Sequence, residues 1–140
     1  MYNIKMTKDT NKNNKHKILI IEDDSLLRNV LGRTFAGEGF EVIEAEDGAL
    51  GLELAIKEQP AIILLDILMP KLLGTGVVKE ISSRNPDLLK RIIIITSAVE
   101  SEYLASVLEY GVTTYVLKGD HELVDIVKKV HERMSVLNIK

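Results

Sequence analysis

The sequence predicts an α/β protein with a doubly wound parallel sheet, and three observations lead to that prediction. Short apolar runs alternate with helical patterns five times along the chain. The runs are almost unbroken, such as the four isoleucines at 92–95, which is typical of parallel strands covered on both faces. Successive runs begin 20 to 31 residues apart, the length of one strand–helix unit. This alternation favours a sheet sandwiched between helices.

The apolar runs predict strands at 18–21, 41–45, 61–65, 92–95 and 114–117. Apolar residues at helical spacing mark helices at 27–35, 48–59, 77–85, 104–108 and 123–134, with Asp47 as the cap of the second helix. A five-stranded chain of this size most often takes the strand order 2-1-3-4-5 with helices on both faces. We therefore expect a flavodoxin-like (βα)5 fold.

The composition excludes several classes of protein. A length of 140 residues corresponds to one domain. The chain has no cysteine, which excludes a disulfide framework, a thiolate metal site and a cysteine nucleophile, and which fits the reducing cytoplasm where we expect the protein. The longest apolar runs are about five residues, far below the roughly 18 needed to span a bilayer. We therefore expect no membrane insertion.

The net charge of −3 is unevenly distributed along the chain. Residues 1–17 hold five lysines against one aspartate, whereas the remaining residues hold 13 basic and 20 acidic side chains. We interpret residues 1–16 as a disordered basic tail and residues 17–140 as the folded domain. The acidic body argues against direct binding of nucleic acid, which usually needs a basic face.

Polar side chains follow four of the five predicted strands. Glu22 and Asp23 come after the first strand, and Asp66 comes after the third. Since these strands are neighbours in the order 2-1-3-4-5, their carboxylates should meet at one edge of the sheet. Thr96 follows the fourth strand and Lys118 follows the fifth. Lys118 would start roughly 10 Å from Asp66, at about 4.8 Å per strand, which a lysine stem can largely bridge.

This set of side chains suits phosphoryl transfer. Clustered carboxylates repel one another, so a hard divalent cation such as Mg²⁺ is expected among them. A lysine and a hydroxyl complete a site that neutralises and positions a phosphoryl group. Asp66 stands alone after its strand and is the candidate nucleophile, giving an aspartyl-phosphate. Taken singly, Glu22 or Asp23 could be a helix cap, Asp66 a turn residue and Lys118 a surface lysine, but their convergence favours a site.

Four stretches of the chain resemble a known family. The segments ILIIEDDSLLR, IILLDILMP, IIIITSA and TYVLKGD stand in the order and spacing of the acidic pair, phosphoacceptor block, Thr/Ser switch and lysine block of response-regulator receiver domains. The resemblance covers about residues 17–137. It identifies the folded part as a receiver domain of two-component signalling.

The resemblance implies a role for each matching residue. Asp66 would accept the phosphoryl group, and Lys118 and Thr96 would contact it. Tyr115 would be the switch aromatic that turns inward when Thr96 moves. Four groups would hold Mg²⁺ or Mn²⁺: Glu22, Asp23, Asp66 and the backbone carbonyl of Leu68.

Three positions depart from the usual family pattern. The first acid is Glu22 instead of the usual Asp, a frequent variant that should still reach the metal through water. Leu73 stands where Asp is common before Gly74, and its apolar side chain would suit a partner contact. Gly119 replaces the proline that usually follows the lysine. A cis bond before a residue other than proline costs about 2.5–4 kcal/mol, so we expect a trans bond and a looser loop.

The resemblance implies a phosphoacceptor rather than a turnover enzyme, although the domain could promote its own phosphorylation and dephosphorylation. A histidine kinase or phosphotransfer protein would be the donor. Only 22 residues follow Lys118, so we expect a stand-alone regulator that signals to a downstream protein through the face of the fourth helix, fifth strand and fifth helix. The same face is a candidate for homodimerisation.

Two other functions remain open from the sequence. The first is a receiver-like adaptor that works without phosphorylation, which Leu73 and Gly119 favour and Asp66, Thr96 and Lys118 oppose. The second is a flavin protein of the same fold. The acidic Glu22–Asp23 loop opposes it, because that loop would repel a flavin phosphate.

Overall fold

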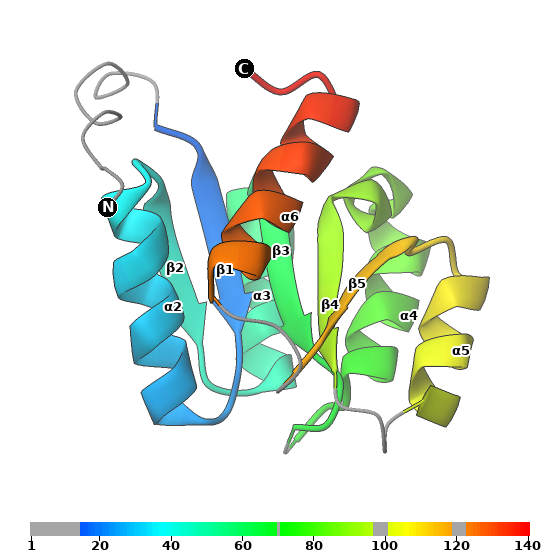
Figure 1. The fold of residues 1–140 in the computed structure, drawn as a ribbon. Helices are drawn as coiled ribbons and strands as arrows, with labels where there is room; N and C mark the ends of the chain where they lie inside the picture. The colour runs from blue at the N-terminus through cyan, green and yellow to red at the C-terminus, as the bar shows by residue number, and fades with distance from the viewer. Residues whose placement is uncertain (1–14, 70, 97–100, 119–122) are drawn as a thin grey trace.

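The computed structural model describes residues 15–69, 71–96, 101–118 and 123–140, and its centre is a parallel sheet (Figure 1). The strands are β1 (Lys17–Ile21), β2 (Glu41–Ala45), β3 (Ile62–Asp66), β4 (Ile92–Thr96) and β5 (Thr114–Leu117). Their order in the sheet is β2-β1-β3-β4-β5, and every neighbouring pair is parallel. The predicted fold class and strand order are confirmed.

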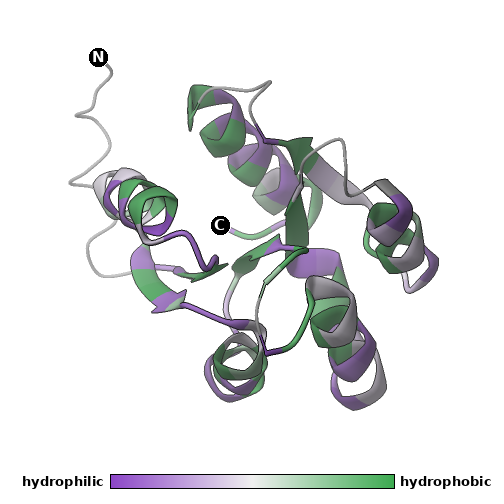
Figure 2. Ribbon diagram, turned by 90° about the horizontal axis from the view of Figure 1, so that it is seen from below, coloured by the Kyte–Doolittle hydropathy of each residue, from purple (hydrophilic) through white to green (hydrophobic). Residues whose placement is uncertain are grey.

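Within the described ranges, five α-helices cover the two faces of the sheet. They are α2 (Ser25–Gly37), α3 (Gly48–Glu58), α4 (Gly74–Arg84), α5 (Ser101–Glu109) and α6 (Leu123–Val136). In Figure 1, α2 and α6 lie on one face, and α3, α4 and α5 lie on the other. Figure 2 shows the same arrangement along the strands, with hydrophobic sides of the helices turned toward the sheet.

Two apolar clusters, one on each face of the sheet, form the core. Successive side chains of a strand point to opposite faces, so Ile18 and Ile20 of β1 pack with Phe35 of α2, while Leu19 and Ile21 join the opposite cluster. All five residues of β3 and of β4 are buried. This explains why these strands are unbroken apolar runs in the sequence.

The structure adds one element that the sequence did not predict. A 3-10 helix, η2 (Pro86–Arg91), leads directly into β4. Its proline lies in the first turn, where a missing N–H is tolerated, and Leu88 and Leu89 are buried in the core.

β1 begins at Lys17, the first residue of the predicted domain. Residues 1–14 lie outside the described part of the chain, so the disordered tail stays a prediction. Among the residues that the structure describes, no helix combines the length and the hydropathy that a bilayer span requires.

Aspartates cap the two helices that follow β1 and β2. Asp24 accepts hydrogen bonds from the backbone N–H groups of Leu26 at 3.0 Å and Leu27 at 3.2 Å, which caps α2. Asp47 accepts one from Leu50 N at 2.8 Å, which confirms it as the cap of α3. Both aspartates satisfy donors that a helix leaves unpaired at its first turn.

The cap at Asp47 predicts a pH dependence of stability. The hydrogen bond from Leu50 N, and to a smaller degree Lys71, lowers the pKa of Asp47 below its usual 3.8. A lowered pKa in the folded state contributes stability above the unfolded pKa, and this is lost as the pH falls through the folded pKa. We therefore expect Asp47→Asn to unfold at a lower temperature than the unmodified chain at pH 7.

The difference between the two proteins should shrink as the pH falls below about 4. Thermal unfolding followed by circular dichroism from pH 7 to pH 3 measures it. A difference that is constant over this range would contradict a role for the charged form of Asp47.

Candidate functional site

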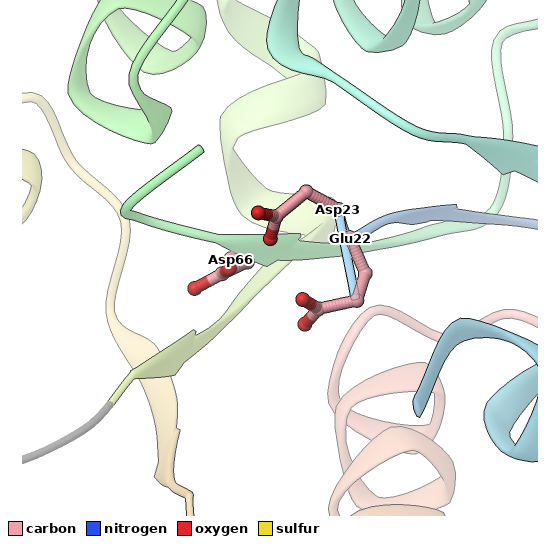
Figure 3. Close-up of side chains that lie close together, drawn as sticks. All are labelled: Glu22, Asp23 and Asp66. Carbon is pink, nitrogen blue, oxygen red and sulfur yellow. The ribbon is translucent and has the colours of Figure 1, made fainter. Parts of the chain in front are cut away.

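Three carboxylates meet at the edge of the sheet where the strands end. One oxygen each from Glu22, Asp23 and Asp66 lies within 4.8 Å of the other two. Glu22 and Asp66 are buried and Asp23 is exposed. Figure 3 shows the three carboxyl groups pointing to the same side, past the ends of β1 and β3. The predicted convergence of these residues is confirmed in position.

The sheet itself sets these positions. The backbone N–H of Glu22 donates to Ala45 O at 3.1 Å, which extends the β1–β2 pairing by one residue. Asp66 is the last residue of β3 and pairs with Ile95 of β4. Because β1 and β3 are neighbours, residues that follow one strand and end the other are brought together at the switch point of the fold.

Lys118 reaches this acidic cluster from β5. Its Nζ lies 3.3 Å from Asp66 Oδ1 and 3.4 Å from Glu22 Oε1, so the expected reach across the sheet is confirmed. The backbone N–H of Lys118 donates to the carbonyl of Thr96 at the end of β4. Thr96 is fully buried. The backbone of Lys118 is therefore held to Thr96, while its amine lies against the carboxylates of Asp66 and Glu22.

The charges at the site shift the pKa values of two groups. Burial raises the pKa of Glu22, although the hydrogen bond from Asp24 N (3.1 Å) and the charge of Lys118 oppose that shift. Burial would lower the pKa of Lys118, but the carboxylates of Asp66 and Glu22 outweigh it and raise the pKa. The amine is thus charged at neutral pH and neutralises part of the negative charge of the acidic cluster.

The donor set fits a hard divalent cation. Carboxylate oxygens are the ligands that Mg²⁺ prefers in proteins. The buried Oε1 of Glu22 lies 3.4 Å from Lys118 Nζ as an ion pair but accepts no hydrogen bond from the residues that the structure describes, so it has capacity for a further partner. The Lys118 ammonium group also pairs with two of these three carboxylates, and its single positive charge leaves an excess of negative charge when all three are ionised.

The loop after β3 is held close to the site by Gly74. Its backbone N–H donates to Ile67 O at 2.6 Å. A Cβ at Gly74 would lie 2.7 Å from Asp66 O and 2.6 Å from Ile67 Cα, so no larger residue fits without a backbone shift. Leu68, whose carbonyl is a candidate ligand, lies in this loop, and its metal-binding role stays a prediction.

The expectations for Leu73 and Gly119, two of the departures from the family pattern, both stay predictions. Leu73 precedes α4 at the capping position, makes no side-chain cap hydrogen bond and is 39% exposed. Its contact with a partner stays a prediction. Gly119 lies outside the described residues, so the trans bond after Lys118 and the looser loop also stay predictions. Tyr115 lies on β5 and is 43% exposed, so its ring is turned outward in this structure.

The contact of Arg28, on α2, with the acidic pair was not predicted from the sequence. Its guanidinium reaches back to the carbonyl of Glu22 at 2.8 Å and pairs with Glu44 on β2. An arginine six residues after Glu22 was visible in the sequence. The packing of α2 against β2 turns its side chain back onto the backbone, away from solvent, and the sequence does not show that packing.

The position of Lys118 predicts how stability responds to its removal. In Lys118→Met, Asp66 and Glu22 lose a cation that lies within 3.4 Å of both. We expect the metal-free protein to lose on the order of 1 kcal/mol of unfolding free energy at pH 7, because breaking a buried pair leaves carboxylates uncompensated, while the 28% exposure of the lysine tempers the loss. Urea unfolding in EDTA measures the loss.

Added Mg²⁺ should recover stability more strongly in Lys118→Met than in the unmodified chain, since the ion no longer competes with the ammonium group. Lys128→Met, which removes an exposed lysine from α6, is the control and should behave as the unmodified chain does. Equal responses of all three proteins to Mg²⁺ would contradict this expectation.

Comparison with known proteins identifies the family. The model of the response regulator receiver domain matches residues 18–131. The transcriptional regulatory protein DegU of Brevibacillus brevis is 35% identical over 131 residues, which are 91% of this chain and 55% of DegU. The probable transcriptional regulator ycf27 of Porphyra purpurea is 36% identical over 107 residues, which are 76% of this chain and 43% of that protein. The chain spans about half the length of these relatives.

Solved structures share the fold. The REC domain of AraT, a response regulator from Geobacillus stearothermophilus, is 26% identical with a TM-score of 0.76, over 88% of this chain and 95% of that one. A CheY-like receiver domain protein from Methanospirillum hungatei superposes with a TM-score of 0.78 at 24% identity, over 86% of this chain and 94% of that one. With the family match over residues 18–131 and the acidic cluster at the strand ends, these likenesses lead to one conclusion: the chain belongs to the response regulator receiver domain family.

Proposed function

We propose that this receiver domain accepts a phosphoryl group on Asp66 from a histidine kinase or a phosphotransfer protein, with the help of Mg²⁺ or Mn²⁺. One observation carries the proposal. Three carboxylates within 4.8 Å of one another share a site with a lysine amine 3.3 Å from Asp66. That combination provides a nucleophile, a cation site and a fixed positive charge, which are the parts that phosphoryl transfer needs.

In the proposed reaction, a carboxylate oxygen of Asp66 forms a bond to phosphorus as the bond from phosphorus to the donor's histidine nitrogen breaks. The imidazole leaves with the electron pair, and Asp66 becomes an acyl phosphate. Glu22, Asp23, Asp66 and the backbone carbonyl of Leu68 would hold the divalent cation, which would supply positive charge to neutralise the phosphoryl oxygens. Lys118 pairs with a phosphoryl oxygen, and Thr96 donates a hydrogen bond to one. The domain is thus a phosphoacceptor and no turnover enzyme.

The proposed output is a changed protein contact. Thr96 moves toward the phosphoryl group, Tyr115 turns inward, and the face formed by α5, β5 and α6 changes shape. The outward position of Tyr115 and the burial of Thr96 support this order of events. A downstream protein that binds the altered face more tightly shifts the equilibrium between the two states. The stand-alone arrangement, the cytoplasmic location and a homodimer through this face stay predictions.

A phosphorylation-independent adaptor is the second candidate function. The exposed and uncapped Leu73 favours it, because an apolar side chain beside the site suits a permanent contact. Binding of Mg²⁺ separates the two candidates, since an adaptor has no need of the cation.

The proposal is tested by incubating the protein with a small acyl phosphate and measuring its intact mass. We expect a gain of one phosphoryl group in the presence of Mg²⁺, and none when EDTA removes the ion, because three carboxylates without a cation repel the incoming phosphoryl group. An unchanged mass with Mg²⁺, or the same gain with EDTA, would overturn the proposed function.

A further inference from the structure

Arg28 joins the acidic pair of the site to the rest of the fold. It lies on the first turns of α2, four residues after the capping Asp24. Its Nη1 donates to the carbonyl oxygen of Glu22 at 2.8 Å and lies 3.5 Å from the carbonyl oxygen of Asp23. The Arg28 side chain is 16% exposed. The guanidinium therefore binds the backbone of both acidic residues at the point where the chain leaves β1 and enters α2.

The other side of the guanidinium is fixed by strand β2. Arg28 Nε lies 3.3 Å from Glu44 Oε1. The second oxygen of Glu44 lies against α2 at Gly32, where a Cβ would come within 2.5 Å of it. Gly32 is buried, so the glycine leaves room for the carboxylate between the strand and the helix. Glu44, Arg28 and the acidic loop thus form a connected chain of contacts.

We propose that Arg28 is a positioning residue for the cation site, and that Glu44 holds Arg28 in place. The inference deepens the proposed function, because it rests on Glu22 and Asp23 being metal ligands. A backbone fixed at the Glu22 and Asp23 carbonyls aims both side chains toward Asp66. Groups that orient metal ligands in this way commonly change metal affinity by about 10- to 100-fold when they are removed.

Because Arg28 is positively charged, an electrostatic role and a positioning role predict opposite changes in metal affinity when it is removed. A guanidinium beside a cation site repels the cation, so a purely electrostatic role predicts that its removal raises metal affinity. A positioning role predicts the opposite, because the acidic loop loses its anchor. The two effects act in different directions, and one binding measurement decides between them.

The test is calorimetric titration of Mg²⁺, and separately Mn²⁺, into the full chain without any phosphoryl donor. Arg28→Gln should bind either ion about 10-fold more weakly than the unmodified chain. Arg28→Lys should also bind more weakly, because a single ammonium group cannot replace a planar fork that serves Glu44 and the Glu22 carbonyl together. The control is Arg33→Gln, which removes the same charge from an exposed position on the same helix and should bind as the unmodified chain does.

Gly32→Ala tests the same contacts without removing any charge. The added Cβ would push against the end of the flexible Glu44 side chain, so the Arg28–Glu44 pair should weaken and the affinity for Mg²⁺ should fall by less than in Arg28→Gln. A double-mutant cycle tests the link itself: Glu44→Gln should weaken binding in the unmodified chain and have little effect when Arg28→Gln is already present. Thermal unfolding in EDTA identifies which variants are folded, and Arg28→Lys keeps the test decisive if Arg28→Gln does not fold.

Unchanged or tighter binding in Arg28→Gln, or in Arg28→Lys if Arg28→Gln does not fold, would overturn the positioning role. Unchanged binding in Gly32→Ala would overturn the part played by Glu44. Equal effects of Glu44→Gln in the two backgrounds would overturn the link from β2. All three results leave the proposed function intact, provided that the unmodified chain binds Mg²⁺. An unmodified chain that binds no Mg²⁺ would overturn the metal-dependent function and this inference with it.

Discussion

Asp66→Asn should abolish uptake of a phosphoryl group from an acyl phosphate. A carboxamide is a far weaker nucleophile than a carboxylate and cannot form the acyl phosphate. The substitution keeps the size of a side chain that is 3% exposed, so the packing around it should be retained. Intact mass after incubation with the donor and Mg²⁺ is the measurement, and thermal unfolding of the variant shows that it is folded.

The matched control is Asp87→Asn, which removes an exposed carboxylate of η2. This variant should take up one phosphoryl group at the rate of the unmodified chain. If a folded Asp66→Asn protein gained the same mass, the acceptor would have to be another residue, and the assignment of Asp66 would be wrong.

Gly74→Ala should cause the largest loss of stability among the substitutions considered. Its Cβ would lie 2.6 Å from Ile67 Cα and 2.7 Å from Asp66 O. Both contacts are with backbone atoms, so no side-chain rotation relieves them. We expect a loss of about 3 kcal/mol of unfolding free energy, at the upper end of the usual range for overpacking. The midpoint of thermal unfolding should fall by roughly 10 °C.

Gly37→Ala is the control for this prediction. Gly37 also belongs to a helix, and a Cβ there would meet nothing within 4 Å. Because alanine favours the helix and reduces the freedom of the unfolded chain, this substitution should be neutral or slightly stabilising. Equal unfolding midpoints for Gly74→Ala and Gly37→Ala would contradict the close approach of α4 to the end of β3.

The sheet could be predicted from local sequence patterns, and the acidic cluster could be predicted from the strand order that those patterns imply. The unbroken isoleucines of β4 reflect burial on both faces, and the carboxylates of Glu22 and Asp66 meet because β1 and β3 are neighbours. The strand order then also placed Lys118 within reach of Asp66. Each of these predictions needs only the period of the pattern and the topology of the sheet.

Contacts that depend on packing between elements could not be predicted. Nothing in the sequence states that Arg28 turns back to the Glu22 carbonyl. Likewise, the residues around Pro86 did not indicate a 3-10 helix in which Leu88 and Leu89 are buried. The need for glycine at Gly74 is set by the distance between α4 and the end of β3, which emerges only when the chain is folded.

Locating the phosphoryl group on the chain is the most direct test of the proposed chemistry. An acyl phosphate is reduced by borohydride to the alcohol, so a phosphorylated aspartate becomes homoserine, which peptide mass mapping identifies. After incubation with an acyl phosphate and Mg²⁺ and reduction, we expect homoserine at position 66 and an unmodified side chain at Glu22 and Asp23. A peptide containing residue 66 that is unchanged, or a reduced residue at another position, would contradict Asp66 as the phosphoacceptor.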